Sequence, residues 1–297
     1  MLPGLLIDTS SWRNAVLNRA WLRRASDLKV PIVLTSEVAR ELVVSALVPS
    51  SDAEFEEVRA ACVLVTRYAT ETTRPAEWHF ASVAGVRLEG PNPLRLCEVV
   101  AECRASKDMA ARSKAQLYVG GGRDFRLSDA ARIMREEKAT WARSIRNAID
   151  GVHAGLPDAR KRQHPVTIPR VEYERIRGQW LTQADAFVDY QIARTQNTLG
   201  DELPSGWDTA DARQRIREAL QAHVAIHAEA ILDCFDHPFN ANRRKVRLEG
   251  NDWYDLAQTR YLAEDRIWVT DDRRWIGIGE QARTPGRIVS PSGLALA

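Results

Sequence analysis

Long hydrophobic runs are missing from this sequence of 297 residues. None of its apolar stretches approaches the roughly 20 residues that a membrane-spanning helix requires. Cysteine is also scarce, and the four residues Cys62, Cys97, Cys103 and Cys234 form neither CxxC pairs nor a secreted disulfide framework. The chain begins almost at once with a strand-like segment, which leaves no room for a charged leader. We therefore expect a cytoplasmic, reduced protein with no membrane partner.

A surplus of charge of either sign is absent as well. The net charge is +2, and 28% charged with 44% hydrophobic residues is an ordinary globular composition that argues against disorder. Only six of the 42 basic residues are lysines. Arginine suits bidentate contacts with phosphate, but the base composition of a genome biases arginine use in the same direction. This preference alone does not identify a nucleic-acid partner.

Several catalytic motifs are also missing. The glycines at 120–122 are not followed by Lys-Ser or Lys-Thr, so they form no phosphate-binding P-loop, and no serine stands in a GxSxG motif. His223 and His227 lie four residues apart on an expected helix, with Cys234 and His237 downstream, which is a spacing found in zinc sites. Because the glutamate of an HExxH motif is missing and apolar residues surround the pair, we favour an ordinary packed helix over zinc.

Both ends of the chain show the alternating pattern of an α/β fold. Short apolar runs at 5–7, 30–34, 267–269 and 288–289 are typical of parallel strands that are buried on both faces. Helices are expected from residue 10 or 11 to about 28, at 37–47, at 52–62, from 251 or 252 to 262, and at 273–282, with a further short strand at 63–65. Strands that alternate with helices predict an α/β protein with a mostly parallel central sheet.

The middle of the chain has a different character. Residues 72–93 are expected to be irregular, and long helices are expected at 94–119, 127–149, 170–199 and 209–235. No β-rich pattern and no internal repeat is evident there. The sequence thus predicts a discontinuous core of residues 1–68 and 246–297, with residues 69–245 as a large all-α insertion.

Acidic residues stand where the strands are expected to end. Asp8 ends the first run, Glu41 lies on the helix after the second, and Asp255 lies near the start of the helix that precedes the third. Asp271 and Asp272 end the third run. Ligands of open α/β sheets bind at this edge, yet two carboxylates about 6 Å apart repel by roughly 3 kcal/mol at an effective dielectric near 20. A cluster of four therefore requires cations or protons, and carboxylate oxygens favour Mg²⁺ or Mn²⁺ over zinc.

Each acid also has an ordinary structural explanation. Asp8 can cap the following helix, and Glu41 can pair with an arginine. Asp255 can belong to a capping box, and the acid pair after the third run suits a turn. We favour the metal site because the ordinary explanations require all of these positions to coincide by chance.

Four ordered blocks carry a family resemblance: Leu-Leu-Ile-Asp-Thr-Ser at 5–10, Thr-Ser-Glu-Val-Ala-Arg-Glu-Leu at 35–42, Asn-Asp-Trp-Tyr-Asp-Leu-Ala at 251–257 and Trp-Val-Thr-Asp-Asp-Arg-Arg-Trp at 268–275. Their order, and the spacing of the last two, resemble the signature blocks of PIN-domain nucleases. The resemblance covers roughly residues 1–65 and 246–297. It implies a PIN-like three-layer α/β/α core and a hydrolase that cuts RNA internally with Mg²⁺ or Mn²⁺.

The resemblance also assigns residues. Carried over one by one, the catalytic, metal-binding acids are Asp8, Glu41, Asp255 and Asp272. The supporting polar residues are Thr9 or Ser10, and Thr270. Asp252 and Asp271 are additional acids near the metal, and Asp271 can take the place of Asp272. The long insertion departs from the compact members of the family and bears on which substrate is selected.

A basic cluster just before the third block is a candidate nucleic-acid-binding surface: Arg243, Arg244, Lys245 and Arg247. Such a cluster can bind the phosphate backbone, and Phe239 or Trp253 nearby can stack a base; a solvated charge run explains the same pattern. RNA is the expected substrate. The alternatives are a structure-specific DNA nuclease of the same core fold and a catalytically silent nucleic-acid-binding or scaffold module. The insertion can select substrate, form a homo-oligomer or bind a protein partner.

Overall fold

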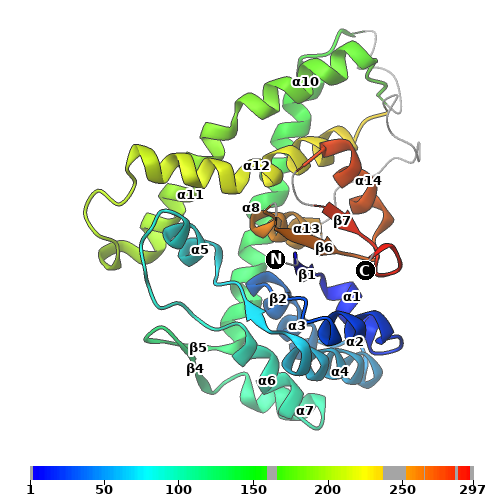
Figure 1. Ribbon diagram of the computed structural model, residues 1–297, viewed down its shortest axis with the longest axis vertical. Coiled ribbons are helices and arrows are strands. Elements are labelled where there is room, and N and C mark those ends of the chain that lie inside the picture. The colour runs from blue at the N-terminus through cyan, green and yellow to red at the C-terminus, as the bar shows by residue number, and fades with distance from the viewer. Residues whose placement is uncertain (1–2, 159–165, 237–251, 264, 285–286, 295–297) are drawn as a thin grey trace.

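A five-stranded, all-parallel sheet forms the centre of the computed structural model, which describes residues 3–158, 166–236, 252–263, 265–284 and 287–294. The strands are β1 (Gly4–Ile7), β2 (Ile32–Leu34), β3 (Glu71–Thr72), β6 (Arg266–Val269) and β7 (Arg287–Val289). Their order is β3-β2-β1-β6-β7, so strands from the two ends of the chain are neighbours at the centre of the sheet (Figure 1). The expected α/β fold with a parallel sheet is confirmed.

Alternate residues of the central strands face two different hydrophobic cores. Leu5 and Ile7 of β1 contribute to one core, and Leu6 contributes to the other. This division follows from the two-residue period of a strand. All four residues of β1 are buried, as expected of a parallel strand that is covered on both faces.

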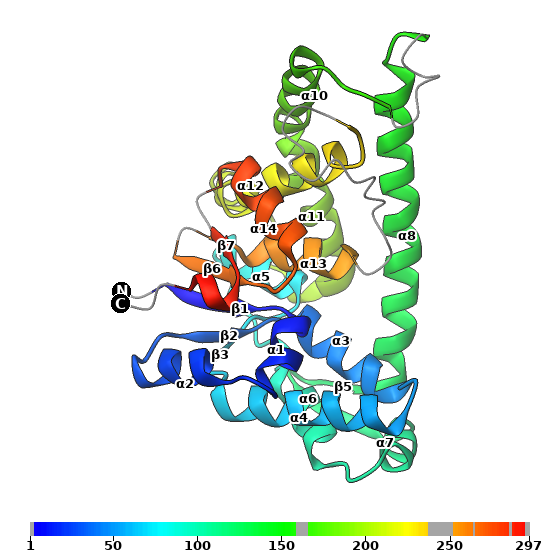
Figure 2. The same ribbon diagram turned by 90° about the vertical axis from the view of Figure 1, so that its right-hand side faces the viewer.

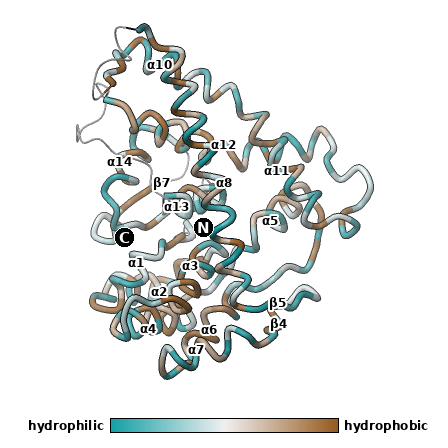
Figure 3. The backbone as a smooth tube through the Cα atoms, turned by 180° about the vertical axis from the view of Figure 1, so that it is seen from behind, coloured by the Kyte–Doolittle hydropathy of each residue, from teal (hydrophilic) through white to brown (hydrophobic). Residues whose placement is uncertain are grey.

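Helices cover both faces of the sheet, as Figure 2 shows from the side. The first core includes residues of α1 (Thr9–Ala15), α2 (Ala20–Asp27), α3 (Ser36–Leu47), α4 (Asp52–Tyr68), α6 (Leu94–Glu102) and α7 (Ser106–Arg112). The second core includes residues of α12 (Ala210–Leu232), α13 (Asp252–Gln258), the 3₁₀ turn η2 (Thr259–Tyr261) and α14 (Arg273–Ala282). Hydrophobic and hydrophilic residues alternate along these helices (Figure 3), which is typical of helices with one buried side.

The remaining elements surround this central unit. They are α5 (Ala76–Val83), β4 (Gln116–Gly120), β5 (Arg123–Arg126), α8 (Leu127–Ala154), α10 (Arg170–Thr182), α11 (Ala184–Leu199) and the 3₁₀ turns η1 (Gly200–Glu202) and η3 (Pro291–Gly293). The long helix α8 stands along one side of the molecule (Figure 2). Within the described ranges, no helix has both the length and the apolar character needed to cross a membrane.

The prediction that residues 69–245 are purely helical is wrong at two places, since β3 of the central sheet also lies within that range. Strands β4 and β5 form an antiparallel hairpin within that range. Gly120, Gly121 and Gly122 have φ values of 93°, 64° and 67°, which side chains other than glycine rarely tolerate. The glycine triplet, which lies between the helices expected at 94–119 and 127–149, therefore makes a tight hairpin turn.

Other element boundaries also differ from the prediction. The strand expected at 63–65 is wrong, because these residues lie inside α4, and the strand of that region is β3. Residues 72–93 are not wholly irregular, since α5 buries Trp78 and Phe80 there. The helix expected at 94–119 divides into α6, α7 and β4, and the one expected before residue 28 divides into α1 and α2.

Parts of the region predicted as an insertion belong to the packing around the sheet. From α12, Ala222, Ile226 and Ala230 pack in the same core as Leu6 and Trp268 of the central strands. Residues of α6 pack in the core on the other face. The boundaries of the discontinuous core at 1–68 and 246–297 stay a prediction, but α6 and α12 contribute to the same packed unit as those segments.

Candidate carboxylate site

Asp8 lies at the carboxyl end of β1, at the point where the strand order reverses. Neighbouring strands β1 and β6 connect to opposite sides of the sheet, which is where open α/β sheets bind ligands. Asp8 is the N-cap of α1, and its Oδ1 accepts a 2.6 Å hydrogen bond from the Ser11 backbone N–H. Its Oδ2 accepts hydrogen bonds from the hydroxyls of Thr270 at 2.5 Å and Ser10 at 3.0 Å. The expected helix-capping role is therefore real, and it leaves a buried carboxyl at the edge of the sheet.

Glu41 reaches the same edge from the first turns of α3. Its Oε2 accepts a 2.5 Å hydrogen bond from the hydroxyl of Thr9, the residue that follows Asp8. The ordinary explanation, an ion pair with an arginine such as Arg40, is not observed among the residues that the structure describes, where Arg40 lies 3.9 Å from Glu137 instead. Thr9 thus links the second predicted acid to the first.

Asp255 reaches the edge from α13. Its Oδ2 accepts a 2.9 Å hydrogen bond from the indole Nε1 of Trp275 on α14. This bond fixes the direction of the carboxylate, because an indole can only donate.

The pKa values of all three carboxyls are raised, and two of them are raised partly by a neighbouring carboxylate. Burial is the largest cause that raises the pKa of Asp8, and hydrogen bonds from Thr270 and Ser11 act against it. Burial and then the charge of Asp8 raise the pKa of Glu41. Burial, followed by the charges of Glu41 and Asp8, raises the pKa of Asp255 well above its usual value. Like charges raise a carboxyl pKa only at short range, so the fold brings these three acids from distant segments together.

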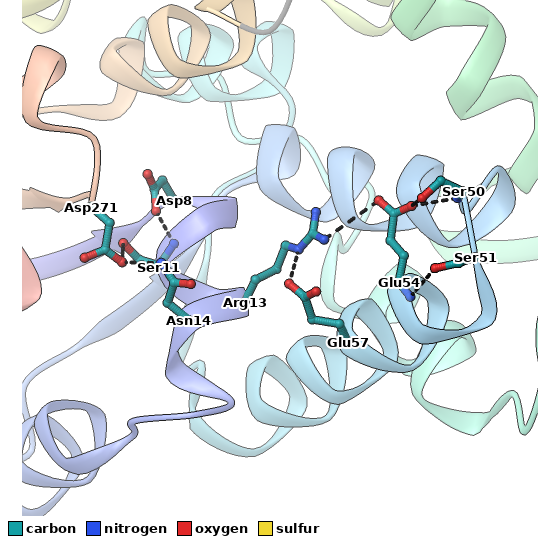
Figure 4. Close-up of polar contacts among 9 residues, drawn as sticks. All are labelled: Asp8, Ser11, Arg13, Asn14, Ser50, Ser51, Glu54, Glu57 and Asp271. Carbon is teal, nitrogen blue, oxygen red and sulfur yellow. Dashed lines mark hydrogen bonds and ion pairs between the residues drawn. The ribbon is translucent and has the colours of Figure 1, made fainter.

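The remaining predicted acids lie around this group in different roles. Exposed Asp271 accepts hydrogen bonds from Asn14 Nδ2 at 2.8 Å and Ser11 Oγ at 3.4 Å. Figure 4 shows Asp8 and Asp271 on either side of Ser11. Asp272 is exposed and caps α14 by accepting from the Arg274 backbone N–H at 2.8 Å.

Asp252 is placed differently from the other acids. Its carboxylate pairs with the side chain of Arg274 at 3.1 Å, and that arginine also contacts Asp233 at 3.2 Å. Asp252 therefore already has a cationic partner. Ser11 donates its backbone N–H to Asp8 and its hydroxyl to Asp271. Of the two additional acids, Asp271 is therefore better placed to act together with Asp8.

Several residues at the site were not anticipated from the sequence. Trp275 stands at the end of the fourth block, but nothing in that pattern indicated a bond to Asp255. Lys138 of α8 and Arg13 of α1 each act to lower the pKa of Glu41. Arg13 also pairs with Glu57 at 2.6 Å (Figure 4). Lys138 comes from the region predicted as an insertion, and only the tertiary fold shows that it lies near the acids.

The side chains fit a metal ion only with help from other ligands. Among the described residues, no three carboxylate, imidazole or thiolate side chains lie close enough to hold one ion together. Of the alternative zinc site, His223 bonds to Thr259 and Cys234 donates to the carbonyl of Ala230, whereas His237 lies outside the described residues. Mg²⁺ commonly takes one or two carboxylates and completes its shell with water and substrate phosphate, and the cluster of repelling acids can supply that number.

Some predicted residues fall outside the described ranges. They are Arg243, Arg244, Lys245 and Arg247 of the basic cluster, together with His237 and Phe239. The predicted supporting residues Thr9, Ser10 and Thr270 all donate to carboxylates of the site. Their role as supporting residues stays a prediction.

Comparison of the chain with family models, with curated proteins and with solved structures found no match.

Proposed function

We propose that this chain is a divalent-metal-dependent endoribonuclease, a hydrolase of RNA phosphodiester bonds, with a PIN-like three-layer α/β/α core. One observation carries the proposal: Asp8, Glu41 and Asp255 come from three distant segments, and at the carboxyl edge of the sheet the charge of Asp8 raises the pKa of Glu41 while the charges of both raise the pKa of Asp255. A fold that gathers like charges in a partly buried place loses stability unless a cation binds there.

The residues that would hold Mg²⁺ or Mn²⁺ are Asp8 with Glu41 or Asp255, and Asp271 or Asp272 is the fourth acid. When bound, such an ion stabilises charge on a phosphodiester and makes water a better nucleophile near neutral pH. The hydroxyls of Thr9 and Thr270 hold the carboxylates of Glu41 and Asp8 in place. The indole of Trp275 does the same for Asp255. Fixed carboxylates orient a substrate without reorganisation during the reaction.

The chain's cations favour an anionic substrate at this edge. The charges of Lys138 and Arg13 both act to lower the pKa of Glu41, and Lys138 also lies 5.0 Å from the ring centroid of Tyr254. Positive groups near an acidic centre attract a phosphate backbone, while the acids remain available to bind the metal ion. The basic cluster at 243–247 is proposed as a further part of this surface.

A cleavage assay tests the function directly. The purified protein is incubated with end-labelled RNA, circular RNA and labelled DNA strands, each with Mn²⁺ or with EDTA. We expect Mn²⁺-dependent cutting of linear and circular RNA, since a circle can only be cut internally, and no cutting in EDTA.

The other outcomes separate the alternatives. Cutting of DNA but not RNA would identify a DNA nuclease of the same core fold. No cutting of any strand with Mn²⁺ or Mg²⁺ would contradict the proposal and favour a silent binding module.

A further inference from the structure

We propose that a second site, a cavity of about 710 Å³ enclosed by α8, α11, α12, α13 and η2, binds a nucleotide through Arg260, Gln191 and His227. None of the carboxylates Asp8, Glu41 and Asp255 lines this cavity. The binding of a nucleotide here does not require that the chain is a nuclease. Its volume lies within the range of about 300–1,000 Å³ that is typical of small-molecule sites.

The cavity has a buried floor and an exposed rim. Gln191, Trp253 and Arg260 are buried among the residues that line it, whereas Thr140 and Tyr190 stand at its exposed rim. An enclosed floor with an open rim permits a ligand to enter and lose most of its water.

Polar atoms on the floor lack partners. Arg260 is 7% exposed, and among the described residues its guanidinium forms no hydrogen bond or ion pair, with Nε fully buried. Gln191 is 2% exposed, and its Oε1 accepts no hydrogen bond from any residue that the structure describes. Both ring nitrogens of His227 are buried and unpaired there as well. Leaving a buried polar group unpaired destabilises the folded protein, and a charged group does so most, so a bound ligand that pairs with these groups would remove several such penalties at once.

The unpaired groups specify the chemistry of the ligand. Burial and the charge of Arg260 lower the pKa of His227 to about 4, so at neutral pH its ring offers one donor and one acceptor. The Oε1 atom of Gln191 requires a donor, and the guanidinium of Arg260 requires acceptor oxygens, ideally a phosphate. A base with amino and ring-nitrogen groups, joined to a phosphate, supplies all of these.

The walls suit a flat ring. Phe187 lies with its ring centroid 5.2 Å from His227 and 5.8 Å from His223, and Trp141 and Trp253 also line the cavity. Aromatic walls of this kind hold nucleobases by stacking.

Negative charge at the rim does not oppose a phosphate near the floor. Glu136 is paired with Arg132 at 3.1 Å, and Glu137 is paired with Arg194 at 2.6 Å. The charge of Arg260 acts on buried Glu37, whose pKa it lowers against the larger effect of burial. Tyr261 donates to Glu37 at 3.0 Å, so that carboxyl already has a hydrogen-bond partner of its own.

The position of the cavity allows two sources for the nucleotide. Helix α13 contributes Trp253 and Leu256 to the cavity and Asp255 to the carboxylate edge. The ligand is therefore a free mononucleotide or the terminal nucleotide of a nucleic-acid strand.

Calorimetric titrations in EDTA test the proposal. The full chain is titrated with AMP, GMP, CMP and UMP, and with a short oligoribonucleotide. We expect saturable binding of at least one mononucleotide, or of the oligonucleotide alone if the source is a strand end. Arg260→Gln removes the charge, and His227→Phe keeps the ring but removes its nitrogens. Each should weaken binding by at least about 10-fold, the effect of losing a buried charge-assisted or neutral hydrogen-bonding group.

Two control variants make the outcome decisive. Arg59→Gln changes a half-buried arginine of α4 that pairs with Glu56, and Asp208→Asn changes an exposed acid outside the cavity. Both variants should bind the nucleotide as the wild type does. Thermal melting verifies that all four variants fold. Failure of the wild type to bind any of these ligands, or undiminished binding by the folded Arg260 and His227 variants, overturns the proposal. Because EDTA removes metal ions, neither result depends on whether the chain is a nuclease.

Discussion

Replacing Asp8 with Asn is expected to reduce Mn²⁺-dependent RNA cleavage by more than about 100-fold. Removing groups that merely support metal ligands typically costs 10–100-fold, and Asp8 is proposed as a ligand itself. The asparagine retains an oxygen that can accept the 2.6 Å bond from the Ser11 backbone N–H. Helix α1 should therefore stay capped, and the loss should reflect chemistry and not unfolding. Initial cleavage rates at saturating metal measure the effect.

A matched control is Asp208→Asn, which removes one negative charge from an exposed position outside the site. This variant should cleave at the wild-type rate. If Asp8→Asn is folded, as judged by its melting curve, and cleaves RNA as fast as the parent, the catalytic site is misassigned.

Replacing Asp255 with Asn is expected to stabilise the metal-free protein near neutral pH. Burial and the charges of Glu41 and Asp8 raise the folded-state pKa of Asp255 well above its usual value. A raised carboxyl pKa means that the folded state holds the proton more tightly than the unfolded state. Stability is therefore lost as pH rises from the unfolded pKa, near 4, through the raised folded pKa. Asparagine carries no charge and can still accept the 2.9 Å bond from Trp275.

We therefore expect metal-free Asp255→Asn to be more stable than the wild type near neutral pH, by about 1 kcal/mol or more. For a large domain, 1 kcal/mol corresponds to a rise of about 2–4 °C in melting temperature. The difference should shrink towards zero as pH falls below about 4, where the wild-type carboxyl is protonated in both states. Melting curves in EDTA across this pH range measure it. A variant that is less stable than the wild type at every pH would show that Asp255 is not electrostatically strained.

Added Mn²⁺ should reverse the order of stability. An ion that binds only the folded state stabilises it in proportion to its affinity and concentration. The wild type should therefore gain more from Mn²⁺ than Asp255→Asn does. Comparing the variant with the wild type thus separates the destabilisation by the clustered acids, measured in EDTA, from the stabilisation by the bound ion, measured with Mn²⁺.

The sequence predicted the centre of the fold well because its signals are local. Apolar runs such as Leu5–Ile7 and Ile267–Val269 predict buried parallel strands, and both are central strands of the sheet. Strand β3 was missed because Glu71 and Thr72 are exposed and polar and carry no such signal. The hairpin of β4 and β5 was missed because its turn depends on positive φ at successive glycines, which a sequence shows only as a break.

The candidate site was predictable in part for the same reason. Acids at the end of a strand, such as Asp8, or in a helix that begins at the same edge, such as Glu41 and Asp255, are expected at one edge of a parallel sheet, and the charges of Asp8 and Glu41 act on Asp255 in the structure. The bond from Trp275 and the proximity of Lys138 depend on how α14 and α8 pack, which no local pattern reveals. The cavity around Arg260 was not anticipated, because it requires α8, α11, α12 and α13 to enclose a common space.

The binding of Mn²⁺ to the folded chain, followed by isothermal titration calorimetry near neutral pH, tests the central claim most directly. We predict saturable binding to the wild type, at least about 10-fold weaker binding to Asp8→Asn, and unchanged binding to Asp208→Asn. Absence of binding to the folded wild type, or equal affinity in the wild type and Asp8→Asn, would contradict the assignment of these carboxylates as a metal centre.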